Sequence, residues 1–147
     1  MVRKILAAAA GAALLTFVGA GIASAADPFG TWLTGDGKAR VRIAPCGGAV
    51  CGSIVSLKEP IDPETGRPKT DKHNADAGKR SRPMIGVRIV LGMKPSGADK
   101  WAGQVYNAED GKTYTGYLTL TGASTLRLEG CVLGGLICKS QNWTRTK

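Results

Sequence analysis

The sequence has few of the side chains that carry enzyme chemistry. Its 147 residues include one histidine, His73, and 5% aromatic residues, which leaves few rings to stack on a substrate. A serine or cysteine nucleophile usually needs a positioned base, and His73 lies in a loop-like segment without an evident partner. No carboxylate pair or oxygen-ligand loop has a recognised spacing. We therefore expect a protein that is not an enzyme, with no catalytic residue, metal or cofactor.

Helical periodicity is absent after residue 26, and period-two alternation replaces it. Arg40-Val41-Arg42-Ile43 and Leu126-Arg127-Leu128-Glu129 put apolar side chains on one face and charges on the other, as in an antiparallel sheet with one wet face. Asp-Gly and Gly-Gly turns separate the runs and favour tight hairpins. The predicted strands are 30–34, 38–45, 49–57, 84–93, 100–106, 112–121, 124–132 and 136–146. An all-β, up-and-down antiparallel barrel of about eight strands is the simplest arrangement, and an open sandwich is the alternative.

Acidic residues are absent before Asp27, and the start of the chain has the pattern of an export signal. Arg3 and Lys4 precede an apolar run, and Ala23-Ser24-Ala25 fits a small-x-small cleavage site. We expect residues 1–25 to be a cleaved signal peptide and 26–147 to form one domain, periplasmic or secreted, without a transmembrane segment in the mature protein. Cleavage would leave about 120 residues, which suits one modest core. An uncleaved membrane anchor is the alternative.

The four cysteines all follow the expected cleavage site, and an even number in an exported chain indicates disulfides. Three pairings are possible. The spacing favours the local one, Cys46 with Cys51 and Cys131 with Cys138, because each pair flanks a Gly-rich turn where strand ends meet. A zinc site of four thiolates is the rival interpretation, but neither pair has the two-residue spacing of a zinc knuckle.

One long segment, 58–83, interrupts the regular spacing of strands and contains four of the seven prolines. A connection of this length is either functional or loosely ordered, and we expect it at one rim of the barrel. Its last part and the next strand carry Arg80, Arg82 and Arg88, which can hold a carboxylate or phosphate group. Together with Tyr106 and Tyr114 they are our candidate ligand-binding residues. In the alternative interpretation, the arginines pair with Asp71, Asp76 or backbone carbonyls and fix the loop.

Two tryptophan motifs lie near the ends of the expected domain. Gly30-Thr31-Trp32 opens it, and Trp143-Thr144-Arg145 closes it. We expect Gly30, Trp32, Trp143 and Arg145 to close one end of the barrel, with Arg145 stacked on the Trp32 indole. A ligand would then enter at the other end.

The chain has a formal net charge of +9, with 20 basic and 11 acidic side chains. An exported protein rarely meets nucleic acid, so an anionic envelope surface or a protein partner is the more natural counterpart of this charge. Solubility alone is the simpler explanation. We expect no nucleic-acid partner.

Taken together, several of these motifs resemble a known family. Gly30-Thr31-Trp32 and an arginine in the last strand are similar to the structural signature of lipocalins and their calycin relatives. Nearly the whole expected domain resembles the bacterial domain-of-unknown-function family 2147. The matching pieces are Gly30-Thr31-Trp32-Leu33, Cys51-Gly52-Ser53-Ile54-Val55, Asp71-Lys72-His73-Asn74, Arg80-Ser81-Arg82-Pro83-Met84-Ile85-Gly86, Asp110-Gly111-Lys112-Thr113-Tyr114 and Trp143-Thr144-Arg145.

The resemblance implies an exported, lipocalin-like β-barrel and brings no established activity. Ala75-Asp76-Ala77 departs from the proline-containing stretch expected there, which affects the loop and not the fold. Our main hypothesis is a binding module for a small apolar or amphipathic ligand. The alternative is an envelope interaction or structural protein with a filled barrel that acts through its basic loop. An enzyme acting on envelope components is the weakest hypothesis.

Overall fold

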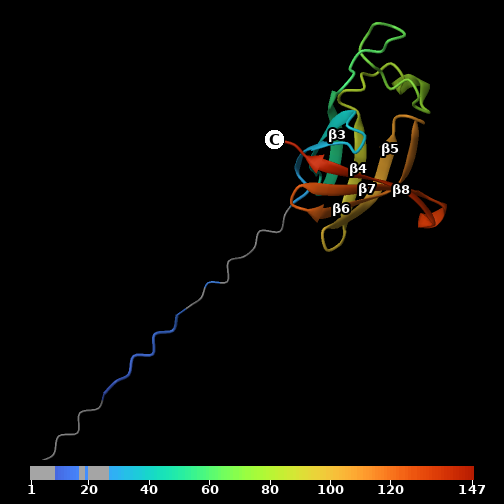
Figure 1. The fold of residues 1–147 in the computed structure, drawn as a ribbon. Coiled ribbons are helices and arrows are strands. Elements are labelled where there is room, and N and C mark those ends of the chain that lie inside the picture. The colour runs from blue at the N-terminus through green and yellow to red at the C-terminus, as the bar shows by residue number, and fades with distance from the viewer. Residues whose placement is uncertain (1–8, 17–18, 20–26) are drawn as a thin grey trace, which may run out of the picture.

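The computed structural model describes residues 9–16, 19 and 27–147. Eight strands make up almost all of the regular structure (Figure 1). They are β1 (Gly30–Leu33), β2 (Ala39–Cys46), β3 (Ala49–Leu57), β4 (Arg88–Gly97), β5 (Lys100–Asn107), β6 (Lys112–Gly122), β7 (Thr125–Val132) and β8 (Ile137–Arg145). Two short 3-10 turns, η1 (Ala77–Lys79) and η2 (Leu133–Gly135), lie in the connections.

The strands form a closed antiparallel barrel in simple chain order. Each strand pairs with the next, and β1 closes the barrel by pairing with β8 through Trp32 opposite Arg145 and Leu33 opposite Thr144. The predicted eight-stranded up-and-down barrel is therefore confirmed, and the open sandwich is excluded. Closure leaves no free sheet edge along the barrel.

The predicted boundaries of the fourth strand, 84–93, are wrong. Residues 84–87 form a turn, in which the Val87 N–H donates to the Met84 carbonyl and Gly86 has a φ of +102°. At its other end β4 continues to Gly97, through Pro95. Pairing shifts between Leu91 and Lys94, and a bulged strand tolerates a proline that cannot donate to the ladder. The long connection is consequently 58–87 and not 58–83.

The core lies inside the barrel and borders the cavity described below. Thirteen buried apolar residues form one cluster, with both Trp32 and Trp143 almost fully buried. The cluster comprises Trp32, Val41, Ile43, Val50, Ile54, Val90, Met93, Val105, Leu118, Leu120, Leu126, Leu128 and Trp143. They come from all eight strands and lie on inward-facing positions, as the period-two pattern predicts.

Both disulfides have the predicted local pairing. Cys46 bonds to Cys51 across the β2–β3 hairpin, and Cys131 bonds to Cys138 across the β7–β8 hairpin. No cysteine of the described residues is free. In the chain-entropy picture, loops this short contribute only about 2–2.5 kcal/mol each, which is still useful for a small domain.

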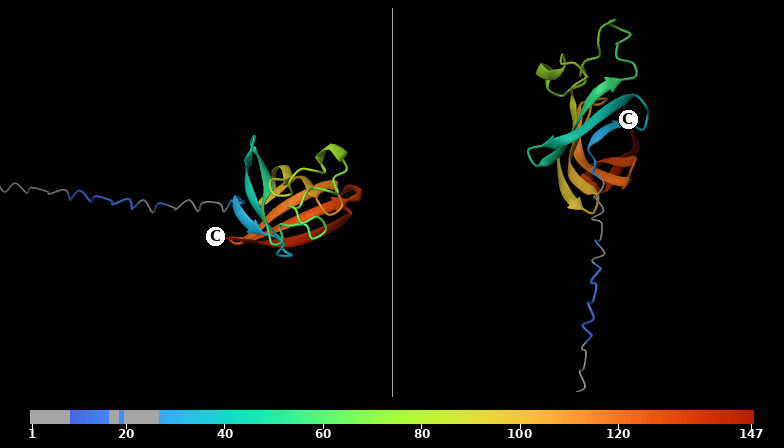
Figure 2. Two further views of the ribbon diagram at one scale, coloured as in Figure 1. Left: turned by 90° about the horizontal axis from the view of Figure 1, so that it is seen from above. Right: turned by 90° about the vertical axis from the view of Figure 1, so that its left-hand side faces the viewer.

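The connection 58–87 rises from one end of the barrel in Figure 1, and the side view on the right of Figure 2 shows it projecting beyond the strands. Two isolated bridges, Ile61 to Pro68 and Thr70 to Pro83, order it. The expected signal peptide, 1–25, falls mostly on residues outside the described ranges. Within the described ranges, no helix is both long and apolar enough to cross a membrane.

Candidate functional site

A cavity of about 1220 Å³ opens at the end of the barrel that carries the long connection. This end also carries the β1–β2, β5–β6 and β7–β8 turns. Small-molecule pockets usually measure about 300–1,000 Å³, so the volume suffices for a ligand larger than a typical metabolite. An eight-stranded barrel holds such a cavity only where inward side chains leave its mouth unfilled.

Part of the cavity wall is apolar. Ile54 and Leu57 come from β3, Val105 from β5 and Leu128 from β7, and Trp143 forms part of the floor. The Trp143 Nε1–H donates to the Gln141 Oε1 at 2.9 Å, so its one polar group is satisfied without a ligand. Trp143 therefore lines the cavity from below as well as filling the core.

Strand β8 brings polar groups onto the inner wall. Ile137, Lys139, Gln141 and Trp143 alternate along the strand, and all four line the cavity. Lys139 lies opposite Gly130 of β7, which has no side chain to cover it. Among the described residues, Lys139 takes part in no salt bridge. A lysine that lines a partly apolar cavity and lacks an acidic partner can bind an anionic group.

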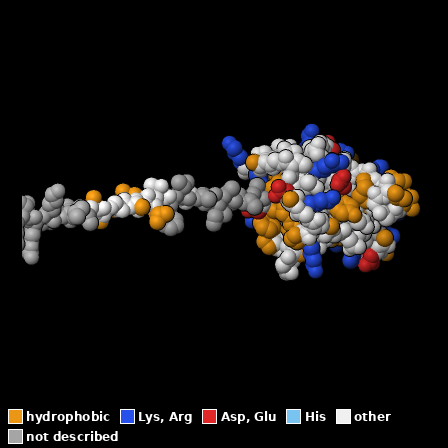
Figure 3. Space-filling model, turned by 90° about the horizontal axis from the view of Figure 1, so that it is seen from below, with side chains coloured by type: hydrophobic (Ala, Val, Ile, Leu, Met, Phe, Trp, Pro, Cys, Tyr) orange, Lys and Arg blue, Asp and Glu red, His pale blue; other side chains and the backbone are white. Residues whose placement is uncertain are grey.

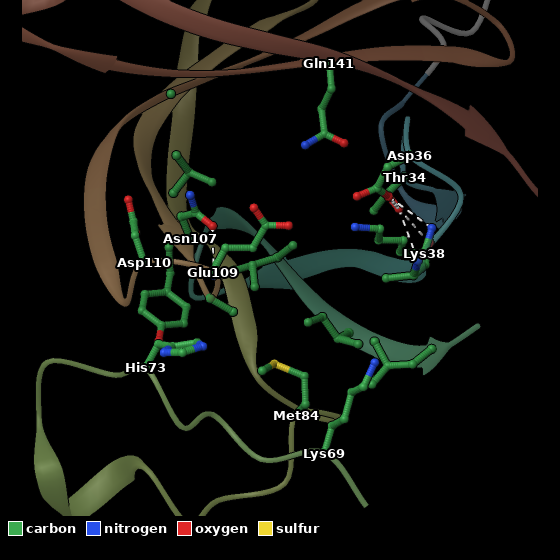
Figure 4. A pocket seen from close by; sticks show the side chains of 18 of the residues that line it. Thr34, Asp36, Lys38, Lys69, His73, Met84, Asn107, Glu109, Asp110 and Gln141 are labelled. Carbon is green, nitrogen blue, oxygen red and sulfur yellow. Dashed lines mark hydrogen bonds between the residues drawn. The ribbon is translucent and has the colours of Figure 1, made fainter. Parts of the chain in front are cut away.

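The rim around the opening carries charges of both signs. Figure 4 shows side chains from separate elements reaching toward the opening, among them Gln141, Lys38 and Lys69. Some rim charges are already paired: the Lys72 ammonium lies 3.4 Å from Asp62 and 4.0 Å from Glu64. The rim lysines are Lys38, Lys58, Lys69 and Lys72. The rim carboxylates are Asp36, Glu59, Asp62, Glu64, Glu109 and Asp110.

Two rim carboxylates are held in place by local hydrogen bonds. Asp36 accepts from the Lys38 N–H at 3.0 Å and from the Thr34 hydroxyl at 2.7 Å. Although burial raises the pKa of Asp36, these bonds hold it below the usual value. Asp110 accepts from the Tyr114 hydroxyl and from the Lys112 N–H. Burial likewise raises the pKa of Asp110, but the hydrogen bonds from Tyr114 and Lys112 and the Lys112 charge together hold it below the usual value.

A buried polar cluster outside the barrel wall fixes the long connection. Asp71 is fully buried and accepts from the Tyr106 hydroxyl at 2.5 Å, the Asn74 amide at 2.9 Å and the Arg82 Nε at 2.9 Å. A second Arg82 nitrogen lies 2.8 Å from the same carboxylate. Burial raises the pKa of Asp71, but the three hydrogen bonds and the Arg82 charge hold it below its usual value. Burial and the bond to Asp71 raise the pKa of Tyr106 to about 12.

The structure separates the five candidate ligand-binding residues. Tyr106 and Tyr114 line the cavity, and none of the three arginines does. Arg82 pairs with Asp71 and lies over the Tyr106 ring at 5.8 Å. Arg80 donates to the Asn74 carbonyl at 2.8 Å. For Arg80 and Arg82 these contacts match the alternative interpretation, in which they fix the loop.

Arg88 lies on a groove outside the barrel wall. This outer groove has a volume of about 820 Å³ and carries more basic than acidic side chains. Its charged lining residues are Lys79, Arg82, Arg88, Lys112 and Asp76.

The opposite end of the barrel is closed by the tryptophan and arginine of the two end motifs. The Arg145 guanidinium stacks 4.3 Å from the centroid of the Trp32 ring and donates to the carbonyls of Asp27, Phe29 and Ala123. Gly30 has a φ of +124°, and a Cβ there would lie 3.0 Å from the Arg145 Nη1. Gly30 therefore leaves room for this arginine. Its placement fits the expected role in closure.

Lys139 is not among the site residues predicted from the sequence, and neither is the role of Asp71 as an acceptor for three side-chain donors. Period-two alternation back from Trp143 places Gln141 and Lys139 on its face, so the signal for Lys139 was present. Asp71 and Tyr106 are 35 residues apart in the sequence, so no local sequence pattern predicts their contact.

A family model described as an uncharacterized protein conserved in bacteria (DUF2147) matches residues 30–145. The chain belongs to the DUF2147 family. The family description names no activity, so it assigns no role to the cavity of this DUF2147 protein.

Protein HP1028 from the human pathogen Helicobacter pylori, described as belonging to the lipocalin family, has a similar solved structure. Its TM-score is 0.69 at 23% sequence identity, over 82% of this chain and 84% of that one. At this identity the likeness establishes a lipocalin-like fold for the DUF2147 domain. A search of curated proteins found no match.

Proposed function

We propose that this protein is a non-catalytic binding module whose cavity holds a small, partly apolar ligand with an anionic head. The cavity itself is the observation that carries the proposal. It has an apolar floor and wall, and it opens toward a charged rim. Such a gradient fits an amphipathic molecule that buries its apolar part and keeps its head near water.

Lys139 is the reason that we expect the ligand to carry an anionic head. Its position on the inner wall, above Gln141 and Trp143, places an ammonium between the apolar floor and the mouth. A carboxylate bound there would gain a charge-assisted hydrogen bond from the ammonium of Lys139, whose side chain is exposed to solvent. We infer a fatty-acid-like anion as the ligand class.

We further propose that the protein acts outside the cytoplasm, in the periplasm or after secretion. Two disulfides in a small domain are typical of oxidising compartments. The apolar, basic-started segment 1–25 has the pattern of a signal peptide. The intact mass of protein recovered from the periplasmic fraction tests this, because export with cleavage would remove those residues.

Native mass spectrometry of protein purified from its own compartment is the direct test of ligand binding. We expect a bound small molecule, or uptake of a long-chain fatty acid on challenge. A protein that stays empty in both cases would contradict the proposal.

The charge assignment has its own test, in which affinities for a fatty acid and the fatty alcohol of equal length are compared. Lys139→Met should weaken fatty acid binding about tenfold and change alcohol binding little, because only the acid gains the ion pair. Lys94→Met is the matched control, since Lys94 is exposed on β4 and outside the cavity. An equal loss of affinity for the fatty acid and the fatty alcohol would show that Lys139 does not recognise the charge of the ligand.

A further inference from the structure

The loop between β7 and β8 is apolar throughout. From Cys131 to Cys138 the sequence is Cys-Val-Leu-Gly-Gly-Leu-Ile-Cys, without one charged or hydrogen-bonding side chain other than the disulfide pair. We call residues 131–138 the apolar tip. Leu133 is 69% exposed, Leu136 85% and Ile137 56%. Single exposed apolar residues are ordinary, but a contiguous group marks a contact surface. Figure 3 shows a group of hydrophobic side chains at the right-hand end of the barrel, with others spread over the same face.

Other turns at the same end of the barrel are polar. The β1–β2 turn carries Asp36 and Lys38, and the β5–β6 turn carries Glu109 and Asp110. The exposure of apolar side chains is therefore particular to the β7–β8 hairpin, which also juts out from the barrel in Figure 1.

The apolar tip is held in a fixed and locally strained shape. The Cys131–Cys138 disulfide joins its two ends, with the Cα atoms 4.1 Å apart. Leu133 has a φ of +54°, a conformation that a bulky side chain adopts only at an energetic cost. Strain of this kind persists mainly at functional positions. A leucine kept there, with most of its side chain exposed, points to a role outside the barrel.

Basic side chains lie beside the apolar tip. Val132 and Leu133 border the outer groove, which carries one carboxylate, Asp76, and four basic residues. One of the four, Arg82, is already paired with the buried Asp71. An apolar point next to a cationic surface is the combination that binds anionic lipid bilayers, because insertion and charge attraction add together. Each basic residue near such a surface contributes about fivefold in affinity.

We propose that the apolar tip docks on anionic phospholipid bilayers, with Leu133, Leu136 and Ile137 inserted and the outer groove facing the headgroups. A protein partner fits less well, since stable interfaces bury about 800 Å² on each side and this tip is a small projection. Docking brings the cavity mouth to the membrane, because Val132 and Ile137 also line it. It does not require an occupied cavity, so it can fail while ligand binding stands.

Vesicle co-sedimentation of the full chain tests the proposal. Vesicles of equal parts phosphatidylglycerol and phosphatidylcholine should bind it, with less binding at high salt or to pure phosphatidylcholine. Leu133→Asn with Leu136→Asn should weaken binding by about tenfold or more. Asparagine tolerates the positive φ of position 133, so the hairpin keeps its fold. Val55→Asn with Ile85→Asn is the matched control, because it removes two exposed apolar side chains that are not part of the apolar tip.

A second measurement reports insertion at the apolar tip itself, whatever residues 1–25 contribute to binding. Leu136→Trp should give a blue-shifted emission that brominated lipids quench, and Val55→Trp should give neither. Unchanged binding by the Leu133/Leu136 double variant, or no quenching of the new tryptophan, overturns the proposal. Concentration-dependent dimers that disappear in the double variant would also overturn it, because the apolar tip would then contact a second copy of the chain.

Discussion

Asp71 has no exposed surface, and donors from two distant parts of the chain hold it. Arg82 and Asn74 belong to the long connection, whereas Tyr106 belongs to strand β5. The carboxylate thereby ties the connection to the outer wall of the barrel. Within the part of the chain that the structure describes, no buried side-chain polar atom lacks a hydrogen-bond partner, so any change at Asp71 leaves donors unpaired.

We expect Asp71→Asn to lower the free energy of unfolding by about 2–4 kcal/mol, because the amide cannot accept from all three donors and leaves Arg82 without its counter-ion. Urea unfolding measures the change, and limited proteolysis should find the connection more readily cleaved. Asp99→Asn is the control: Asp99 is exposed with a φ of +53°, which asparagine accepts. If both variants unfold alike, Asp71 is not the anchor of the connection.

The same carboxylate makes stability depend on pH in the acid range. Its pKa in the folded protein lies below the usual 3.8, so the folded state favours the ionised form. The stabilisation is complete at pH values above 3.8 and is lost as the pH falls through the lowered folded pKa. We expect the difference in unfolding free energy between wild type and Asp71→Asn to shrink below about pH 4. A difference that stays constant down to pH 2 would contradict this assignment.

The contacts of Asp71 show which parts of the structure could be predicted from the sequence and which could not. Pairing of an arginine with Asp71 was one of two open alternatives, because opposite charges in one loop are visible in the sequence. The choice of Arg82 over Arg80, and the part played by Tyr106, depend on how the connection folds back onto β5. That is a tertiary contact, and no local propensity encodes it.

At the scale of elements, one arginine reinforces the closure of the barrel between β1 and β8. Arg145 donates hydrogen bonds to the carbonyls of Asp27 and Phe29 before β1 and of Ala123 in the β6–β7 turn, and it stacks on Trp32. A lysine keeps the charge, but it lacks the planar fork and the stacking surface of a guanidinium.

We expect Arg145→Lys to destabilise the fold by about 1–2 kcal/mol, since carbonyls at the closed end lose their donors. Denaturant unfolding followed by tryptophan emission measures both the stability and the exposure of Trp32. Arg42→Lys is the matched control, because Arg42 is exposed on the outer face of β2. An equal effect of the two substitutions would show that Arg145 is an ordinary surface charge.

Strand boundaries followed the turn residues, with one exception. The Gly-rich hairpins and both local disulfides were predicted because their signals lie within a few residues. Strand β4 was misplaced because Pro95-Ser96-Gly97 has the composition of a turn. The bulge near Gly92 lets the strand bend and continue, and the true turn is at Ala98-Asp99. A bulge is set by the neighbouring strand, so it leaves little trace in the sequence.

At the scale of the whole molecule, the cavity could not be predicted. The alternation of apolar and polar residues identifies the inward-facing positions. The space left between the inward side chains depends on where the large side chains lie along the barrel. Trp32 and Met93 are fully buried in the core and do not line the cavity, whereas Gly130 lies on the cavity wall. Which part of the barrel is filled by side chains and which holds a cavity depends on how the strands are aligned in the closed barrel.

Filling the cavity should therefore remove ligand binding without unfolding the barrel. A ligand that binds only the folded state at 100 times its dissociation constant adds about 2.7 kcal/mol to the free energy of unfolding. In Ile54→Trp with Leu128→Trp, two indoles occupy the wall, and we expect the thermal shift produced by a fatty acid to fall by at least half. Val55→Trp is the matched control, since it is the next residue on β3 and lies outside the cavity. A full shift in the double variant would place the ligand elsewhere on the molecule, and the outer groove would then be the site to test.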